Sequence, residues 1–94
     1  MWSVYILECA DRSLYTGSTT NIERRLVQHQ QGKGAKYTRG RRPVLCRFIR
    51  QYSTRAEAQR VEAGVKKLAR IHKLQLVHDT PLGVDILRMI ERRS

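Results

Sequence analysis

The sequence predicts a small α/β domain of the α+β kind, in which a three-stranded antiparallel sheet is flanked by helices in the order β-β-α-β-α-α. Two patterns support this fold class. A run of β-branched and aromatic residues near the N-terminus is followed by a turn signal and a second such run, which is typical of a hairpin. After the hairpin, helix caps alternate with apolar residues at helical spacing. The 94 residues suffice for one modest core and therefore for one domain.

Caps, breakers and apolar spacing indicate the boundaries of each element. They predict strands over residues 2–9, 14–18 and 44–52 and a helix from the N-cap Asn21 to about Gly32. A long helix is predicted after Ser53 or Thr54, and Ile71, Leu74 and Val77 either continue it or start a new one. A short amphipathic helix is predicted from Pro81. We therefore expect residues 1–80 to form the domain and residues 81–94 to form a C-terminal helix packed on it.

Tyr5 and Tyr15 fall in the two strands of the expected hairpin. They share a face of the sheet only if paired residue numbers sum to an even value, which requires an odd-length turn or a bulge near Asp11. Gly17 lacks a side chain on the face of Tyr15 and leaves space beside it. Half-buried strand aromatics are the more frequent explanation for such a pair. Two phenols beside a gap are nevertheless unusual in a packed sheet.

The charge balance indicates the class of partner. The chain has 19 Lys plus Arg against 8 Asp plus Glu, a formal net charge of +11, with an ordinary hydrophobic fraction of 40%. Such a folded, strongly basic domain favours a polyanion, of which nucleic acid is the commonest. No apolar run is long enough to span a membrane, and the N-terminus lacks a signal-peptide pattern. Cys9 and Cys46 lack disulfide-scaffold or CxxC spacing, so reduced thiols in a cytoplasmic protein are expected. We also expect no membrane partner, and a monomer is favoured.

Ten basic residues and no acidic one lie between Arg24 and Arg55, and seven of the ten fall within residues 33–50, named here the basic segment. Its glycines allow backbone N–H groups to approach phosphates, and its tyrosine can stack on a base. A charge run alone is equally typical of a solvated loop. The combination predicts a long nucleic-acid-binding loop leading into the third strand, with contacts from Lys33, Lys36, Tyr37, Thr38, Arg39, Arg41 and Arg42.

The scarcity of carboxylates restricts the catalytic chemistry. Two-metal nucleases need several carboxylates around ions roughly 3.5–4 Å apart, and no single strand or helix here brings two acids together. The histidines and cysteines show no zinc-ligand spacing, and no GxSxG motif supports a serine triad. A site with one metal and one carboxylate remains open.

Three helical residues are candidates for such a site, each with an ordinary explanation beside the functional one. Glu62 lies at the edge of the apolar stripe of the long helix, where an i, i+4 ion pair with Lys66 is its more frequent role. Arg25 and His29 form an i, i+4 pair on the first helix. They are either a solvated helix face or a phosphate clamp that combines a fork of donors with a proton donor or acceptor.

Taken in order, these residues resemble the GIY-YIG endonuclease superfamily, and residues 32–40 resemble its small bacterial stand-alone branch. The likeness covers about residues 2–78. The two motifs correspond to Ser3-Val4-Tyr5 and Tyr15-Thr16-Gly17, the helical arginine to Arg25 and the metal-binding glutamate to Glu62. Ser3, Val4 and Thr16 depart from the glycine and isoleucines of the pattern but keep small size and β character. Ser18 stands where some relatives carry lysine.

The resemblance implies a DNA endonuclease that hydrolyses a phosphodiester with one divalent ion, usually Mg²⁺, with Mn²⁺ as a substitute. The implied roles are metal binding by Glu62, stabilisation of transition-state charge by Arg25, proton acceptance from water by Tyr15, positioning of that water by Tyr5, phosphate contact or proton relay by His29, and substrate contacts at Gly17 and Ser18. A tyrosine of pKa about 10 is a weak base at neutral pH, so neighbouring cations must favour its phenolate.

The form of the substrate is predicted less sharply. With Tyr37 as a stacking platform and no helix assigned to a major groove, single-stranded or branched DNA is favoured over duplex, and RNA remains open. The alternative from a different functional class is a non-catalytic nucleic-acid-binding module whose tyrosines and arginines only stack and clamp.

Overall fold

The structure is a computed structural model that describes residues 1–78. Its elements are β1 (Trp2–Glu8), β2 (Leu14–Thr19), α1 (Ile22–Gln30), α2 (Lys36–Arg39), β3 (Leu45–Tyr52), α3 (Arg55–Lys66) and α4 (Arg70–His78). The order confirms the predicted β-β-α-β-α-α arrangement with one added element, α2. The helix predicted from Pro81, and with it the boundary at residue 80, lies outside the described residues.

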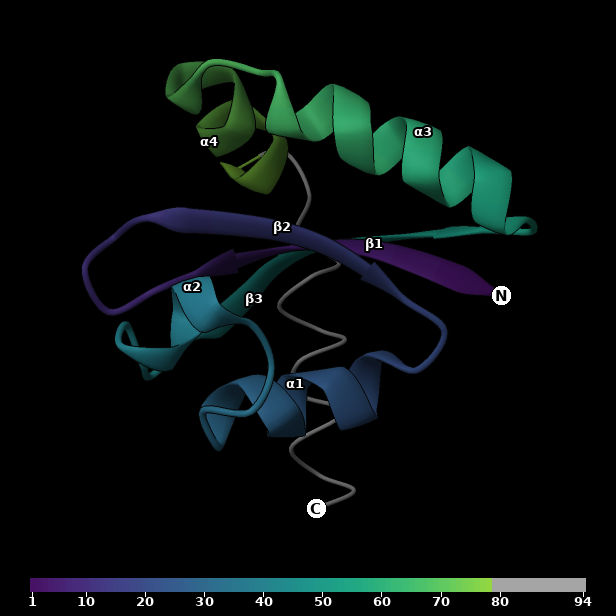
Figure 1. Cartoon of the computed structure of the whole chain (residues 1–94). Coiled ribbons are helices and arrows are strands. Elements are labelled where there is room, and N and C mark those ends of the chain that lie inside the picture. The colour runs from purple at the N-terminus through teal and green to yellow at the C-terminus, as the bar shows by residue number, and fades with distance from the viewer. Residues whose placement is uncertain (79–94) are drawn as a thin grey trace.

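The sheet has the order β2-β1-β3, and both pairs are antiparallel, so β2 is an edge strand (Figure 1). In the hairpin, Tyr5 pairs with Gly17 and Leu7 pairs with Tyr15. Paired residue numbers therefore sum to an even value, because the turn of residues 9–13 has odd length. This register confirms the condition under which Tyr5 and Tyr15 share a face.

Helices cover the two faces of the sheet separately. The face that carries Tyr5 packs against α1, whereas α3 and α4 lie over the opposite face, as Figure 1 shows. Each face has its own apolar cluster. Leu7, Leu26 and Ile49 are among the residues of the first cluster, and Ile6, Phe48 and Val65 are among those of the second. Since side chains alternate along a strand, these two clusters follow directly from the pleat.

Both long helices begin at side-chain caps. Asn21 accepts a hydrogen bond from the Arg24 backbone N–H at 3.0 Å, and Thr54 accepts one from the Glu57 backbone N–H at 3.2 Å. Caps of this kind satisfy backbone donors that have no partner within the helix. They fix where α1 and α3 start, and so fix which face of each helix meets the sheet.

The basic segment differs from its prediction as a continuous loop. Residues 36–39 form the single turn α2, and β3 begins within the segment at Leu45. The turn follows Ala35 in extended conformation, and it ends at Gly40. This short helix brings Thr38, in the middle of the basic segment, against His29 of α1, where the sequence predicted a nucleic-acid-binding loop.

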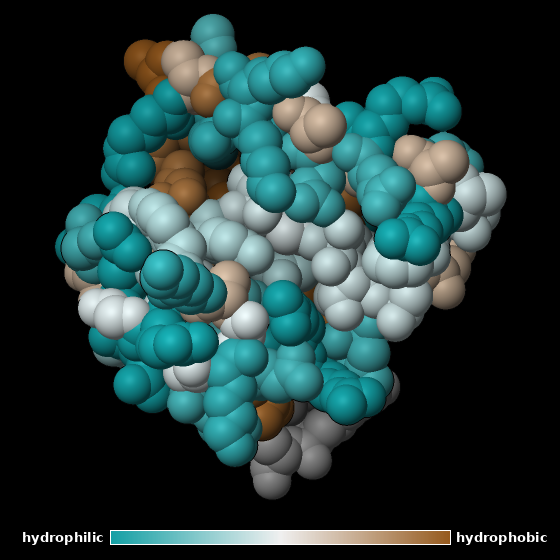
Figure 2. All heavy atoms as spheres, in the orientation of Figure 1, coloured by the Kyte–Doolittle hydropathy of each residue, from teal (hydrophilic) through white to brown (hydrophobic). Residues whose placement is uncertain are grey.

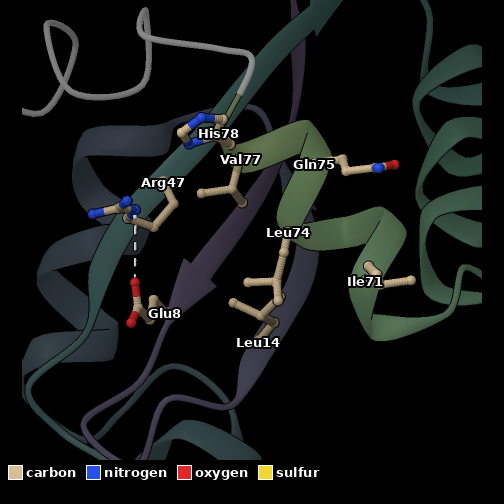
Figure 3. Close-up of a pocket in the computed structure, with 8 residues that line it drawn as sticks. All are labelled: Glu8, Leu14, Arg47, Ile71, Leu74, Gln75, Val77 and His78. Carbon is tan, nitrogen blue, oxygen red and sulfur yellow. Dashed lines mark ion pairs between the residues drawn. The ribbon is translucent and has the colours of Figure 1, made fainter.

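A hollow of about 390 Å³ lies beneath α4 on the far side of the sheet from α1. Figure 3 shows Leu74 and Leu14 facing each other across it, with the ion pair between Glu8 and Arg47 on its other side at 3.6 Å. None of its lining residues belongs to the predicted site. Among residues 1–78, no helix has the length and apolar composition needed to cross a bilayer.

Candidate active site

Three aromatic rings meet on the face of the sheet that α1 covers. Ring centroids lie 6.4 Å apart for Tyr5 and Tyr15, 5.9 Å for Tyr5 and His29, and 5.4 Å for Tyr15 and His29. The Tyr5 hydroxyl lies 3.1 Å from His29 Nε2. Tyr5 and His29 are both essentially inaccessible to solvent, at 1% and 0% exposed. Tyr15 is only half-buried, so its ring is the part of the cluster that solvent reaches.

Gly17 creates the space in which Tyr5 lies. It stands directly opposite Tyr5 in the hairpin register. A Cβ at this position would lie 2.5 Å from the Tyr5 hydroxyl oxygen, 2.7 Å from Cζ and 3.2 Å from a ring carbon of Tyr15. The structure therefore gives Gly17 a definite part, which is to leave room for the Tyr5 phenol against β2.

His29 is held at both ring nitrogens. Besides the Tyr5 contact at Nε2, Nδ1 lies 2.8 Å from Thr38 Oγ1, and the Thr38 hydroxyl donates to the Ala35 carbonyl at 3.1 Å. Burial, with a further contribution from the Arg25 charge, lowers the pKa of His29 to about 4. The imidazole is therefore neutral at physiological pH, with one nitrogen donating and the other accepting.

Arg25 supplies a positive charge beside both phenols. Interaction with the Tyr5 hydroxyl is the main cause that raises the Arg25 pKa, and Tyr15 adds to it. The guanidinium also donates to Gln28 Oε1 at 3.1 Å, which orients it on the surface of α1. Burial raises the pKa of Tyr5 to about 12 even though Arg25 opposes this, so Tyr5 remains a neutral phenol.

Glu62 lies on α3 and contacts β2 from the other face of the sheet. Ser18 Oγ donates to its Oε1 at 2.5 Å, and Lys66 Nζ lies 2.7 Å from its Oε2. Partial burial alone would raise the pKa of this carboxyl, but the hydrogen bonds from Lys66 and Ser18 outweigh it and hold the pKa below its ordinary value. Glu62 is therefore an ionised, partly exposed carboxylate with a fixed orientation. The predicted ion pair with Lys66 is present.

The cluster of Tyr5, Tyr15 and His29 and the carboxylate of Glu62 lie on opposite sides of the edge strand β2. Tyr15 and Gly17 face α1 while Ser18 faces α3, because neighbouring residues of a strand point to opposite faces. Glu62 is still close enough to Tyr5 to contribute to the rise in the Tyr5 pKa, after the larger effects of burial and Tyr15. The tyrosine side and the Glu62 side therefore meet at the edge strand β2.

Tyr37 already has aromatic and cationic neighbours. Its ring stacks on Tyr15 with centroids 5.9 Å apart, and the guanidinium carbon of Arg41 lies 4.1 Å from the ring centroid. Arg41 is held in turn by Asp11 Oδ2 at 3.0 Å and by the Tyr37 carbonyl at 2.7 Å. Tyr37 is 39% exposed and extends the aromatic surface outward from Tyr15.

The other predicted binding residues divide into two groups. Arg42 is tied into the fold, because it donates to the Arg39 carbonyl at 3.0 Å and to the Gln30 carbonyl at 3.3 Å. Thr38 is completely buried, and its hydroxyl is engaged by His29. By contrast, the side chains of Lys33, Lys36 and Arg39 are exposed and make no hydrogen bond or ion pair within residues 1–78.

Sequence reasoning did not find the inward roles of Thr38, Gly34 and Asp11. Gly34 packs its backbone against the His29 ring, and Asp11 fixes Arg41. A glycine and a threonine spaced four apart around a basic residue carry no periodic signal. Only the lack of a side chain at Gly34 could have indicated that another group packs closely against the backbone there.

Comparisons with known proteins identify the family and agree with the fold. The model of the family described as the GIY-YIG catalytic domain matches residues 1–75. The chain is 50% identical over 74 residues to a UPF0213 protein of Oceanobacillus iheyensis, covering 79% of this chain and 86% of that protein. It is 53% identical over 74 residues to a UPF0213 protein of Clostridium perfringens, covering 79% and 80% respectively.

Two solved structures are similar throughout most of their length. A solution NMR structure of a UPF0213 protein from Bacillus halodurans has a TM-score of 0.55 at 51% identity, with 83% of this chain and 84% of that chain covered. A solution NMR structure of a protein from E. faecalis has a TM-score of 0.58 at 44% identity, with 85% of each chain covered.

Proposed function

The chain belongs to the GIY-YIG catalytic domain family, and on that premise we propose that it is a metal-dependent endonuclease that hydrolyses phosphodiester bonds in DNA. The observation that carries the proposal is the convergence of Tyr5, Tyr15 and His29 with Arg25 at an edge strand whose opposite face holds Glu62. Two phenols, an imidazole and a guanidinium around one strand edge give donors and acceptors to a phosphate and to an attacking water.

The residues fit a site for one divalent cation. Within residues 1–78 no three His, Cys, Asp or Glu side chains are grouped to hold a metal. The family resemblance assigns the metal to Glu62, and this carboxylate is close enough to Tyr5 to affect the Tyr5 pKa. Magnesium suits this donor set, because it keeps several waters and is often held by one or two carboxylates together with substrate phosphate. Mg²⁺, or Mn²⁺ in its place, would supply Lewis-acid stabilisation of charge on the phosphate oxygens.

The chain's own residues divide the remaining tasks. We assign proton acceptance from the attacking water to Tyr15, because the raised pKa of Tyr5 keeps that phenol protonated. Tyr5 orients the water, and its hydroxyl is itself held 3.1 Å from His29 Nε2. Arg25, on the surface of α1 beside both phenols, stabilises the charge that develops on the phosphate in the transition state.

Two hollows beside α1 support a single strand as substrate. One, of about 320 Å³, is lined by residues that include Trp2, Ser18, Arg25 and Gln28, and the other, of about 440 Å³, includes Arg39. A flexible strand that crosses the edge of β2 could place bases in such hollows and on the exposed ring of Tyr37. This supports single-stranded or branched DNA over intact duplex.

The proposal is tested by cleavage assays on matched single-stranded, duplex, flap and RNA substrates with Mg²⁺ or Mn²⁺. We expect the wild-type protein to cut single-stranded or flap DNA. Glu62→Gln should lower the rate by at least ~100-fold while leaving binding unchanged or tighter, because a negative charge near the phosphate is removed. Glu57→Gln, an exposed position on the same helix, is the matched control.

The outcomes separate the two functional classes. Loss of cutting with retained binding in Glu62→Gln supports the endonuclease. Binding without cutting of any substrate by the wild-type protein, with either metal, refutes it and favours a nucleic-acid-binding module that uses the same surface.

A further inference from the structure

The ring of His29 is enclosed by the basic segment. Thr38 Oγ1 lies 2.8 Å from Nδ1, and the backbone of Gly34 lies so close to the ring that a Cβ there would come within 2.6 Å of Cγ. Lys33 precedes this glycine and Lys36 begins α2, two residues before the threonine. The surface cations and the buried enclosure of the histidine therefore belong to one short stretch of chain.

The donor and acceptor geometry of this enclosure fits one tautomer of His29. Arg25 can only donate to the buried Tyr5 hydroxyl, whereas His29 Nε2, which lies 3.1 Å from the same oxygen, can accept its proton. With Tyr5 donating to Nε2, the imidazole proton lies on Nδ1. Nδ1–H then donates to the Thr38 oxygen, and the Thr38 hydroxyl donates to the Ala35 carbonyl. Every buried donor in this chain of groups finds an acceptor.

We propose that Thr38 is a positioning residue that holds His29 in the Nδ1–H tautomer and thereby turns the lone pairs of the Tyr5 oxygen toward the attacking water. This rests on the proposed endonuclease function. With the opposite tautomer, Nε2–H would donate to Tyr5, the phenol proton would point into the site, and the water would meet a donor where it needs an acceptor.

Among the groups that surround His29, Thr38 is the one placed to set its tautomer. The groups that face the ring are Tyr5 from β1, Tyr15 from β2, Arg25 from its own helix and Thr38 from α2. Because the ring is neutral, its single proton lies on one nitrogen or the other. Among these groups Thr38 is the one with a side-chain oxygen within hydrogen-bond distance of Nδ1, at 2.8 Å, so its hydroxyl favours the proton at that nitrogen.

The decisive measurement is the tautomer itself. Nitrogen-15 NMR of histidine-labelled protein at neutral pH distinguishes Nδ1–H from Nε2–H imidazole. We expect wild-type His29 to be Nδ1–H, Thr38→Ser to keep that state, and Thr38→Val, which preserves shape but removes the hydroxyl, to shift it toward Nε2–H. The signals of His72 and His78 on α4 should stay unchanged and serve as internal controls.

Cleavage kinetics give the second readout. Thr38→Val should lower kcat by about 10- to 100-fold, taking as a guide the range known for removal of the group that orients a metal-ligating histidine. The Kd for a single-stranded oligonucleotide should remain within about twofold, since the surface cations are untouched, and Thr38→Ser should restore most of the rate. A purely structural role would instead weaken binding and stability together with the rate.

The possible results separate this inference from the proposed function. An Nε2–H tautomer in the wild-type protein, or an unchanged tautomer and rate in Thr38→Val, overturns the role of Thr38 while cleavage by the wild type still stands. If the tautomer shifts as expected but the wild type cuts no nucleic acid, the control of His29 by Thr38 holds and the endonuclease proposal fails. Should Thr38→Val not fold, the wild-type and Thr38→Ser tautomers decide.

Discussion

His29 shows how burial and hydrogen bonding together fix the state of a single side chain. A buried imidazolium would lose its hydration and would lie beside the cationic Arg25, and both effects favour the neutral form. The neutral ring is in turn the form that can accept from Tyr5 at one nitrogen and donate to Thr38 at the other. The protonation state that the fold requires is therefore also the one that the proposed chemistry uses.

This buried histidine predicts a loss of stability in mild acid. Its pKa is about 4 in the folded protein and about 6.5 in the unfolded chain, so between these values the unfolded state binds the extra proton. The free energy of unfolding should fall as pH drops from about 6.5 to 4, by up to about 3 kcal/mol for this group alone. Denaturant unfolding at a series of pH values measures it.

The control for this pH dependence is a histidine substitution elsewhere. His29→Gln should flatten the slope between pH 6.5 and 4, whereas His72→Gln, at an exposed position on α4, should leave it as in the wild type. An equal slope in wild type and His29→Gln would show that the buried imidazole does not contribute.

Lys66 forms an ion pair with the Glu62 carboxylate, which is also the proposed ligand of the divalent cation. Its ammonium lies 2.7 Å from Glu62 Oε2 and is more than half exposed, so the pair is a weak surface ion pair that a divalent cation can replace. Lys66→Met should therefore lower the Mg²⁺ concentration for half-maximal cleavage by about two- to fivefold. Lys67→Met is the matched control on the next residue. An unchanged or higher Mg²⁺ requirement would mean that the cation does not compete with Lys66.

At the scale of the elements, the β1–β2 hairpin depends on one missing side chain. Gly17→Ala would force the Tyr5 phenol to move, since the added methyl would lie 2.5 Å from its oxygen. We expect a destabilisation of about 1–3 kcal/mol, typical of overpacking, and a loss of cleavage because Tyr5 leaves His29. Thermal or denaturant unfolding and the cleavage rate are the two measurements.

Gly64 provides the matched substitution. It lies inside α3, and a Cβ there would meet nothing within 4 Å. Gly64→Ala should therefore stabilise the protein, by up to about 1 kcal/mol, through better helix propensity. If Gly17→Ala were as well tolerated as Gly64→Ala, the close packing of Tyr5 against β2 would be disproved.

The sheet and the long helices were predictable because their signals extend over many residues. Alternation in the strands and the caps Asn21 and Thr54 act in the same direction. The shared face of Tyr5 and Tyr15 was stated only as a condition, because the predicted strands 2–9 and 14–18 leave four residues between them, whereas β1 ends at Glu8 and leaves five. These signals are local in sequence, and tertiary packing favours the same elements.

The basic segment was predicted less well for a physical reason. A single helical turn has no apolar period, so α2 left no pattern, and its position depends on the contact between Thr38 and His29. Likewise, nothing in the sequence distinguishes arginines that hold the fold together from those that face solvent. Arg41 pairs with Asp11, a residue of the distant hairpin turn, and only the folded chain brings them together.

Over the whole molecule, the basic residues that give the net charge of +11 differ in whether they are bonded within the fold. Figure 2 shows hydrophilic side chains over most of one face, with hydrophobic atoms gathered beside α4. Within the basic segment, Arg41 and Arg42 are used internally, whereas Lys33, Lys36 and Arg39 make no hydrogen bond or ion pair with the part of the chain that is described. These three are candidate cations for phosphate contact.

The salt dependence of oligonucleotide binding tests this division of the charge. Each neutralised phosphate of a single strand contributes roughly −0.7 to the slope of log K against log salt concentration, because condensed counterions are released. Lys33→Ala with Lys36→Ala should therefore make the slope shallower by about 1 to 1.5, measured by fluorescence anisotropy over a series of salt concentrations. The affinity at low salt should fall more than the affinity at high salt.

A matched double substitution keeps the net charge equal and moves the loss away from the basic segment. Lys67→Ala with Lys73→Ala, at the end of α3 and in α4, removes the same two charges and should leave the slope nearly unchanged. Equal slopes in the two variants would mean that the total charge, and not its placement in the basic segment, governs binding. A difference confined to the Lys33 and Lys36 variant would indicate that the strand lies along the segment that encloses His29, which places phosphate contact and the tautomer of the site in one structural unit.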